Sequence, residues 1–407
     1  MTTRGGSIVL AALMLGSVAA ACGSSKSGSG GSSGATETIG ILTDASGLGA
    51  SGNETTVQGV AAGIVEAAKA GIHIKYVVGD TETTPSGALA AAHALVQEDH
   101  VNAIVAVSAL TFTAASYLSK QSIPVVGAAE DGSEWTTSKN MFSVYGYPDE
   151  SAVYTTAGQL FKMEGATSVG TLGYSISPSS SESAKSTSVA AKDVGLKAPY
   201  VNAAFSFGST NVQPVALAMK GDGVDSVYSA TDPNTSFSLL TALRQEGVHV
   251  KVAYFPTGYG GDITQAGPNA LQVAQGAIFS TVTWEPIAMN TSATQQFTAD
   301  LAAAGVKGQP TESEYNGYAS VAALVAALKT TGANPSHAAL TAALAAQSNF
   351  TAWGLTGNLH IDLNNRSLSS GVPAAGCQYF SKLVGSVFQP IPGGDPLCGT
   401  FLERLSS

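Results

Sequence analysis

The glycines between Gly47 and Gly52 have the spacing G-x-G-x-x-G, which binds a dinucleotide when the glycines form the turn from a strand into a helix. In this chain Asp44 to Ser46 separate the first glycine from the preceding predicted strand, and the next predicted helix begins several residues after Gly52. The helix N-terminus therefore cannot receive a pyrophosphate as the motif requires. We interpret the segment as a flexible loop that faces a ligand.

Residues that could bind a metal ion or act as nucleophiles show no catalytic spacing. The chain has six histidines, and the closest pair, His93 and His100, would lie about 10 Å apart along one helix, too far to share an ion. The sequence contains no C-x-x-C and no S-x-x-K, and its G-x-S-x-G lies in a low-complexity segment, residues 30–34. Scattered Asp and Glu residues leave a glycosidase pair as an open alternative. These observations favour a binding protein, without cofactor or metal, over an enzyme.

The overall charge excludes one class of partner. The 407 residues include 28 acidic and 18 basic side chains, which gives a formal net charge of -10. A protein that binds nucleic acid needs clustered Lys and Arg to neutralise phosphates, so no nucleic-acid binding is expected. At roughly 150 residues per domain, the length predicts two domains.

The N-terminal residues are organised like those of an exported lipoprotein. Residues 1–21 combine Arg4, an apolar run and small residues before Cys22, which predicts a secretory signal peptide. The cysteine is similar to the lipidated cysteine of a bacterial lipobox, although Ala19 stands where that motif has Leu. The alternative is an ordinary signal peptide with Cys22 unmodified. Residues 22–36 are then a lipidated cysteine and a Gly/Ser-rich tether that anchors the protein to the outer face of a membrane.

The two remaining cysteines, Cys377 and Cys398, would lie outside the cytosol, where disulfides persist. We therefore expect them to pair and to staple a C-terminal hairpin, with a strand-like run at 379–388 and a Pro/Gly turn at 390–396. Closing a loop of this size would stabilise the fold by roughly 3 kcal/mol. Two free buried thiols are the alternative.

Short β-branched runs alternate with longer helical stretches from Glu37 onward. This alternation predicts parallel sheets covered by helices on both faces. Strands are expected at 38–42, 72–78, 103–107, 124–126, 168–172, 200–205, 226–228, 252–256 and 277–283. Helices are expected at 57–70, 85–98, 112–120, 151–164, 182–194, 212–220, 236–246, 293–304, 314–328 and 336–345. The groups before and after about residue 145 share one order of elements, which predicts two similar lobes.

Apolar residues recur at helical spacing within the helix expected at 314–328. The stripe consists of Tyr315, Tyr318, Val321, Leu324, Val325 and Leu328. A core-facing surface is the usual meaning of such a stripe, and an aromatic ligand box is the alternative.

Ordered short segments from about Glu37 to Asp362 resemble one family, the type I substrate-binding proteins of ABC transporters, in particular the Leu/Ile/Val-binding branch. The segments are residues 39–47, Gly59, Asp80, 103–108, 123–126, 208–211, 224–227, 247–250 and 357–362. The resemblance implies two doubly wound, Rossmann-like α/β lobes joined by three crossovers, with the ligand between them at the carboxyl ends of the strands. Lobe I would comprise 37–149 and 281–357, and lobe II 150–280 and 358–407.

The resemblance also implies the residues of the ligand site. The loop from Ser108 through Ala109 to Thr111 matches the family's carboxylate-binding loop, in which Ser108 would donate its hydroxyl. Helix N-capping is the alternative role of Ser108 and Thr111. The other matched positions are Ala129, Asp131, Ser177, Thr231, Asp232 and Thr257.

Several of these positions depart from the Leu/Ile/Val pattern. Thr257 stands where that branch has the Glu that pairs with the ligand's ammonium group, and Thr231 replaces a Tyr. A buried ammonium group without a carboxylate partner is costly. We hypothesise that Asp131 or Asp232 supplies the missing contact, with solvated or turn-capping carboxylates as the alternative.

Together these features predict an extracytoplasmic substrate-binding lipoprotein of an ABC importer, with no enzymatic activity. It would capture a small polar solute, such as an amino acid, amide or small carboxylate, by lobe closure. Its partners would be the ligand, a membrane permease and the ATPase subunits of that permease. A ligand-sensing receptor head with the same fold and no transport role is the alternative.

Overall fold

The protein is described here by a computed structural model that covers residues 36–145, 151–265, 269–364 and 376–406. All of these belong to one compact unit, Gly34–Ser407. The predicted signal peptide, Cys22 and most of the predicted tether lie outside the described residues.

The first lobe is built on a parallel sheet of order β2-β1-β3-β4-β5. Its strands are β1 (Thr36–Thr43), β2 (His73–Asp80), β3 (Ala103–Val107), β4 (Val125–Gly127) and β5 (Met141–Ser143). The helices between them are α1 (Ala50–Asn53), α2 (Thr56–Lys69), α3 (Pro85–Gln97), α4 (Phe112–Lys120) and α5 (Glu134–Thr137). Alternate side chains of β3 face opposite sides of the sheet, so that Val105 joins one core cluster and Ile104 the other. Burial on both faces explains why β3 is an uninterrupted apolar run.

The second lobe is built on a sheet of order β14-β13-β11-β10-β9-β7-β8. Its parallel strands are β7 (Ser168–Tyr174), β8 (Lys197–Phe205), β9 (Ser226–Ala230), β10 (Val252–Phe255) and β11 (Ile278–Ser280). The antiparallel strands β13 (Phe380–Val384) and β14 (Val387–Pro390) complete one edge. The helices are α6 (Thr156–Met163), α7 (Pro178–Asp193), α8 (Gln213–Gly221), α9 (Pro233–Gln245), α10 (Asp262–Gln265) and α11 (Ala270–Val273). Two doubly wound α/β lobes, as predicted, therefore make up the fold.

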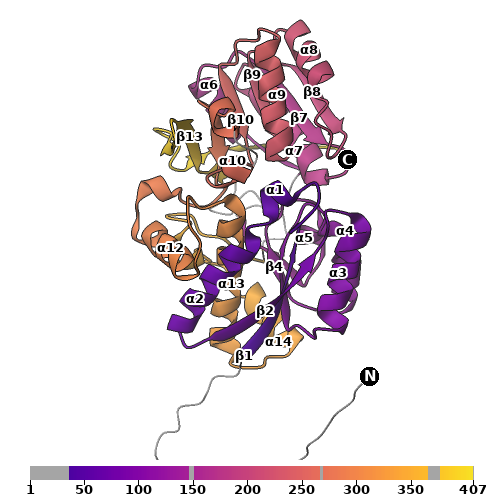
Figure 1. The fold of residues 1–407 in the computed structure, drawn as a ribbon, viewed down its shortest axis with the longest axis vertical. Coiled ribbons are helices and arrows are strands. Elements are labelled where there is room, and N and C mark those ends of the chain that lie inside the picture. The colour runs from indigo at the N-terminus through magenta and orange to yellow at the C-terminus, as the bar shows by residue number, and fades with distance from the viewer. Residues whose placement is uncertain (1–35, 146–150, 266–268, 365–375, 407) are drawn as a thin grey trace, which may run out of the picture. The chain divides into compact units, whose positions relative to one another are not determined.

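After β11 the chain returns to the first lobe. The returning elements are η1 (Ile287–Met289), α12 (Ser292–Ala303), α13 (Glu312–Thr331), α14 (His337–Ala345) and η2 (Ala352–Gly354). The orange helices α12 and α13 lie beside the indigo α2 in Figure 1, and both pack against it. The contact is close because a Cβ at Gly59 of α2 would lie 2.1 Å from the carbonyl oxygen of Glu314. The stripe of apolar residues on α13 is buried in the core.

Three local predictions from sequence are corrected by the structure. The stretch predicted as one helix at 151–164 begins as strand β6 (Ala152–Tyr154), which pairs with the distant β16 (Phe401–Arg404). The helix predicted from residue 182 begins at Pro178, because Ser177 caps its N-terminus. The run predicted as one strand at 379–388 is instead a hairpin that turns at Gly385, whose φ of 65° favours glycine. The Pro/Gly turn predicted at 390–396 is present, and in it the Gly394 amide donates a 2.8 Å hydrogen bond to the Ile391 carbonyl.

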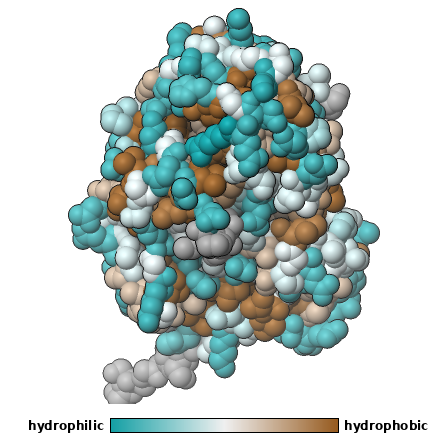
Figure 2. All heavy atoms as spheres, turned by 45° about the horizontal axis from the view of Figure 1, so that its top comes forward, coloured by the Kyte–Doolittle hydropathy of each residue, from teal (hydrophilic) through white to brown (hydrophobic). Residues whose placement is uncertain are grey.

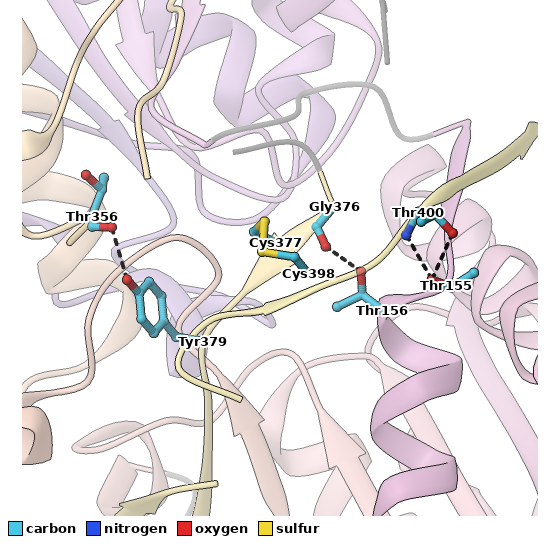
Figure 3. The surroundings of a disulfide bond; sticks show 8 residues. All are labelled: Thr155, Thr156, Thr356, Gly376, Cys377, Tyr379, Cys398 and Thr400. Atoms are coloured by element: carbon cyan, nitrogen blue, oxygen red, sulfur yellow. Dashed lines mark hydrogen bonds between the residues drawn. A yellow bond between two sulfur atoms is a disulfide. The ribbon is translucent and has the colours of Figure 1, made fainter. Parts of the chain in front are cut away.

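The predicted disulfide between Cys377 and Cys398 is present. It joins β12 (Cys377–Gln378) to β15 (Leu397–Cys398), as Figure 3 shows. Threonines at the start of α6 attach this region to the second lobe: Thr156 donates to the carbonyl of Gly376, and Thr155 accepts a 2.9 Å hydrogen bond from the Thr400 amide. The disulfide therefore joins the two short strands beside the N-terminus of α6.

The surface of the described residues is mixed. Hydrophobic and hydrophilic residues are interspersed on the face in Figure 2. Exposed large apolar side chains come from separate parts of the chain, for example Leu48, Tyr76, Val201 and Leu271. Among the residues that the structure describes, no helix has the length and apolarity needed to cross a bilayer.

Candidate ligand-binding site

A cavity of about 270 Å³ lies at the carboxyl ends of the strands of both sheets. The first lobe contributes Ala109 after β3 and Ala129 after β4, and the second contributes Thr231 after β9 and Thr257 after β10. Side chains converge there because parallel strands all end at the same edge of their sheet, where α/β proteins bind ligands. The volume suits a small molecule.

Besides Asp232, three carboxylates from three separate segments border this cavity. Glu130 follows β4, Asp262 begins α10, and Glu312 begins α13. The Tyr145 hydroxyl lies 3.1 Å from Glu130 Oε1 and 3.0 Å from Glu312 Oε1 and links these two acids. We call Glu130, Asp262 and Glu312 the acid cluster.

Burial and mutual repulsion make it unfavourable for all the carboxyl groups of the acid cluster to be ionised. Burial raises the pKa of Glu130 to about 8, although hydrogen bonds from Tyr145 and Asn316 oppose the change. Burial, with the charge of Glu130 next in importance, raises the pKa of Glu312 well above its ordinary value. Burial and then the charge of Glu314 do the same to the pKa of Asp262. A carboxyl group with a raised pKa favours its protonated form, or a cation beside it.

Asp262 is 1% exposed, and its Oδ1 atom has no hydrogen-bond partner. A turn at Gly260 brings Asp262 to the cavity. Gly260 has a φ of 62° and forms an isolated antiparallel β-bridge with Thr311, the residue just before α13. A Cβ at Gly260 would lie 1.8 Å from the Pro310 carbonyl oxygen, so the approach requires glycine. Asp262 therefore offers an unused acceptor at the cavity wall.

Among the described residues that line the cavity, none is Lys, Arg or His. Within the described part of the chain, no group of three or more His, Cys, Asp or Glu residues has the geometry of a metal site. Six aromatic side chains of the described residues contribute to the walls: Tyr145, Tyr154, Tyr174, Phe207, Tyr228 and Tyr254. The part of the lining that the structure describes thus combines carboxylates and aromatic rings without a basic side chain.

The predicted carboxylate-binding loop is already occupied by a carboxylate of the protein itself. Asp44, fully buried, accepts hydrogen bonds from the Ser108 hydroxyl at 2.6 Å and from the Ala109 amide at 2.9 Å. Asn53 donates to the same carboxylate at 2.9 Å, and Thr81 donates as well. The Ser108 hydroxyl, which was predicted to donate to a ligand, and the Ala109 amide are therefore both used within the protein.

Ser108, Thr111 and Asp131 are fully buried and lie outside the cavity lining. The Asp131 carboxylate accepts a 2.7 Å hydrogen bond from the Phe112 amide at the start of α4 and a 3.1 Å bond from the Trp135 indole. Its position supports the capping alternative over contact with a ligand.

Asp232 does line the cavity, but it also caps α9. Its Oδ1 accepts from the Thr235 amide at 3.1 Å, and its Oδ2 accepts from the Tyr174 and Thr235 hydroxyls. Ser177 likewise lines the cavity while capping α7, and the Thr257 hydroxyl donates to the Thr231 carbonyl at 2.7 Å. Of the predicted site residues, the structure brings six to the cavity: Ala109, Ala129, Ser177, Thr231, Asp232 and Thr257.

Sequence reasoning missed the acid cluster and Tyr145. The one available signal was the position of Glu130, between Ala129 and Asp131, directly after a predicted strand. Glu312 lies in the capping box that begins α13, and Asp262 follows a glycine-rich turn, so each has an ordinary local explanation. Nothing local indicates that the three converge.

The fold and its inter-lobe cavity define a class of ligand-binding protein. Residues 36–378 match the model of the periplasmic binding protein family, and the chain belongs to that family. Membership implies a ligand-binding protein that acts outside the cytoplasm. A comparison with curated protein sequences finds no match.

Solved structures share this fold at low identity. A substrate-binding periplasmic protein from Ralstonia solanacearum is 16% identical, covers 88% of this chain and 100% of its own, and superposes with a TM-score of 0.72. An ABC transporter solute-binding protein from R. palustris in complex with 4-hydroxybenzoate is 16% identical (91% and 97% covered, TM-score 0.72). A branched-chain amino acid transporter substrate-binding protein from Streptococcus pneumoniae, in complex with isoleucine, is 18% identical (88% and 99% covered, TM-score 0.71).

Proposed function

We propose that the protein is the substrate-binding component of an ABC importer and captures a small polar solute between its two lobes. The observation that carries this proposal is the cavity at the carboxyl ends of both sheets, lined by polar groups from both lobes. Ligands bind at this position in open α/β sheets. The proposal includes the lipid anchor at Cys22 and the lobe boundaries 37–149 with 281–357 and 150–280 with 358–407.

Contacts across the cavity are compatible with capture by closure. The Ser179 amide donates to the Asp131 carbonyl at 3.2 Å, and Asn234 donates to the Ser51 hydroxyl at 3.3 Å. Neutral contacts of this kind are modest in strength, so a bound ligand can shift the balance between open and closed lobes. The closed lobes would present the surface that a permease recognises.

The ligands of the related structures indicate the size of solute. The R. palustris protein binds 4-hydroxybenzoate and the S. pneumoniae protein binds isoleucine. The cavity of about 270 Å³ suits solutes of this order. The predicted site residues that line it, Ala109, Ala129, Ser177, Thr231, Asp232 and Thr257, are proposed as contacts together with the acid cluster.

The test is a thermal-shift screen of the full chain against amino acids, amides, amines and small carboxylates. A ligand at one hundred times its Kd should stabilise the protein by about 2.7 kcal/mol. Deletion of the gene should then abolish uptake of the stabilising solute, and the Cys22→Ser variant should fail to incorporate labelled palmitate. Ligand binding with unchanged uptake would favour the alternative, a ligand-sensing receptor head.

A further inference from the structure

We propose that the solute is a small organic cation without a carboxylate, such as an amine or amidine, and that Glu130, Asp262 and Glu312 bind its charged nitrogen. This inference rests on the proposed function and names the class of solute for that cavity. Four observations support it.

The first observation is the imbalance of charge. Four carboxylates, the acid cluster and Asp232, border the cavity, whereas the described residues of its lining include no Lys, Arg or His. Buried carboxylates are stable only when they are paired or protonated. A ligand nitrogen that brings positive charge would supply the pairing that the lining lacks.

The second observation is the unused acceptor of Asp262. Buried polar atoms in folded proteins nearly always have a partner, yet Oδ1 of this 1% exposed residue has none. The neighbouring acids cannot donate to it when they are ionised. An ammonium or amidinium group has the N–H donors that this atom needs.

The third observation concerns the loop predicted to bind a ligand carboxylate. The donors of Ser108 and Ala109 are used by the Asp44 carboxylate. A ligand carboxylate placed there would find these donors occupied and would be repelled by Asp44. The site therefore disfavours anions and weakens the binding of zwitterionic amino acids.

The fourth observation is the aromatic wall. Tyr154, Tyr174, Phe207 and Tyr228 line the cavity with the acid cluster. The face of an aromatic ring attracts a cation and also packs against the apolar part of an amine. Raised pKa values of Glu130, Asp262 and Glu312 agree with this arrangement, because a cation would replace protons that these groups retain.

The experiment compares matched ligands that differ in charge. One set is isoamylamine, leucine and isocaproate, and the other is tyramine, tyrosine and 4-hydroxyphenylpropionate. Kd values for the full chain are measured by titration calorimetry at pH 7.5. We expect the amine of at least one set to bind at least tenfold more tightly than its zwitterion or anion.

Isosteric variants test which residues bind the nitrogen. Glu130→Gln, Asp262→Asn and Glu312→Gln should each weaken amine binding at least tenfold. In the ligand-free protein, Asp262→Asn should raise Tm, because it removes a buried acid that repels its neighbours, whereas a purely structural role would lower Tm. The matched control is Glu285→Gln, a buried carboxylate that lies outside the cavity lining, which should leave the amine Kd unchanged.

Tighter binding of a zwitterion or anion than of the amine would overturn the inference while leaving the proposed function intact. Failure of both amines to bind would also overturn it. Isoleucine and 4-hydroxybenzoate, titrated into the same sample, separate the two failures: binding of either one leaves the proposed function standing. Amine binding that survives all three isosteric variants would likewise contradict the assigned residues.

Discussion

The Ser108 hydroxyl donates a 2.6 Å hydrogen bond to the buried carboxylate of Asp44. The chain thus places one of its own carboxylates on the loop that the sequence predicts for a ligand carboxylate. The Ala109 amide and the Asn53 side chain complete the contacts at 2.9 Å. This hydrogen bond, together with the acid cluster across the cavity, favours a ligand that carries positive charge.

Replacing Asp44 should therefore affect stability strongly. Asp44→Ala leaves the buried donors of Ser108, Ala109 and Thr81 without an acceptor, which should lower the free energy of unfolding by about 3–5 kcal/mol. Ser108→Ala should lower it by about 1–2 kcal/mol with little change in ligand affinity. Urea denaturation and calorimetry measure the two quantities. Lost affinity with unchanged stability in Ser108→Ala would show that Ser108 contacts ligand directly.

Asp131 was given two alternative roles, a cap and a contact to the ligand, and substitutions can distinguish them. As a cap of α4 it should tolerate Asp131→Asn, whose amide oxygen can still accept from the Phe112 amide. Asp131→Ala should lower the free energy of unfolding by about 1–2 kcal/mol. Neither change should alter ligand affinity. A tenfold loss of affinity in Asp131→Asn would instead support the hypothesis that Asp131 contacts the ligand's nitrogen.

Stability of the ligand-free protein should decrease as pH rises. Glu130 has a pKa raised to about 8 and Glu314 one raised to about 7, so in this window the folded state binds more protons than the unfolded state. By linkage, the stability that these two carboxyl groups contribute is fully present near pH 4 and is lost progressively as pH rises to about 8. The titratable groups that face the acid cluster are Asp44, Asp131, Tyr145 and Glu314.

Urea midpoints measured at pH 5, 6.5 and 8 provide the check. Glu130→Gln should flatten the decrease, because it removes one of the groups that lose their proton. Stabilisation by an amine should grow over the same range, since the ligand then competes with fewer protons. A wild-type midpoint that rises from pH 5 to pH 8 would contradict the assignment.

Removing the disulfide should destabilise the protein without abolishing its fold. The Cys377→Ser, Cys398→Ser double variant releases a loop with a sequence separation of 21 and should lose roughly 3 kcal/mol. Gln378, next to the bond, lines the cavity, so a modest loss of ligand affinity should accompany the change. Unchanged thermal stability of the double variant would show that the segment is stapled by its other contacts.

Close packing of α2 on α13 should make Gly59→Ala costly. The added Cβ would meet the Glu314 carbonyl oxygen at 2.1 Å, and overpacking of this kind typically costs about 1–3 kcal/mol. Displacement of α13 would also move Glu312, so ligand affinity should fall. Gly221→Ala is the matched control, because no atom lies within 4 Å of its added Cβ. Equal Tm values for the two variants would contradict this packing.

Much of the fold follows from local patterns in the sequence. Buried β-branched runs such as β3 and helices such as α4 were predicted with the observed bounds, because periodicity and turn residues are local properties. The pairing of Cys377 with Cys398 was predicted because both are expected outside the cytosol and are the two cysteines that remain besides Cys22. The pairing of β6 with β16 was missed, since it joins segments far apart in the chain.

The sequence by itself determined that the chain forms two α/β lobes and which family it resembles, because both follow from the order of its helices and strands. Only the tertiary structure decided the chemistry of the cavity. Glu130, Asp262 and Glu312 meet because the sheet order and the return of α13 to the first lobe bring distant segments together. The environment of a carboxylate, including its neighbouring charges and its burial, depends on these long-range contacts, so no local pattern could have shown it.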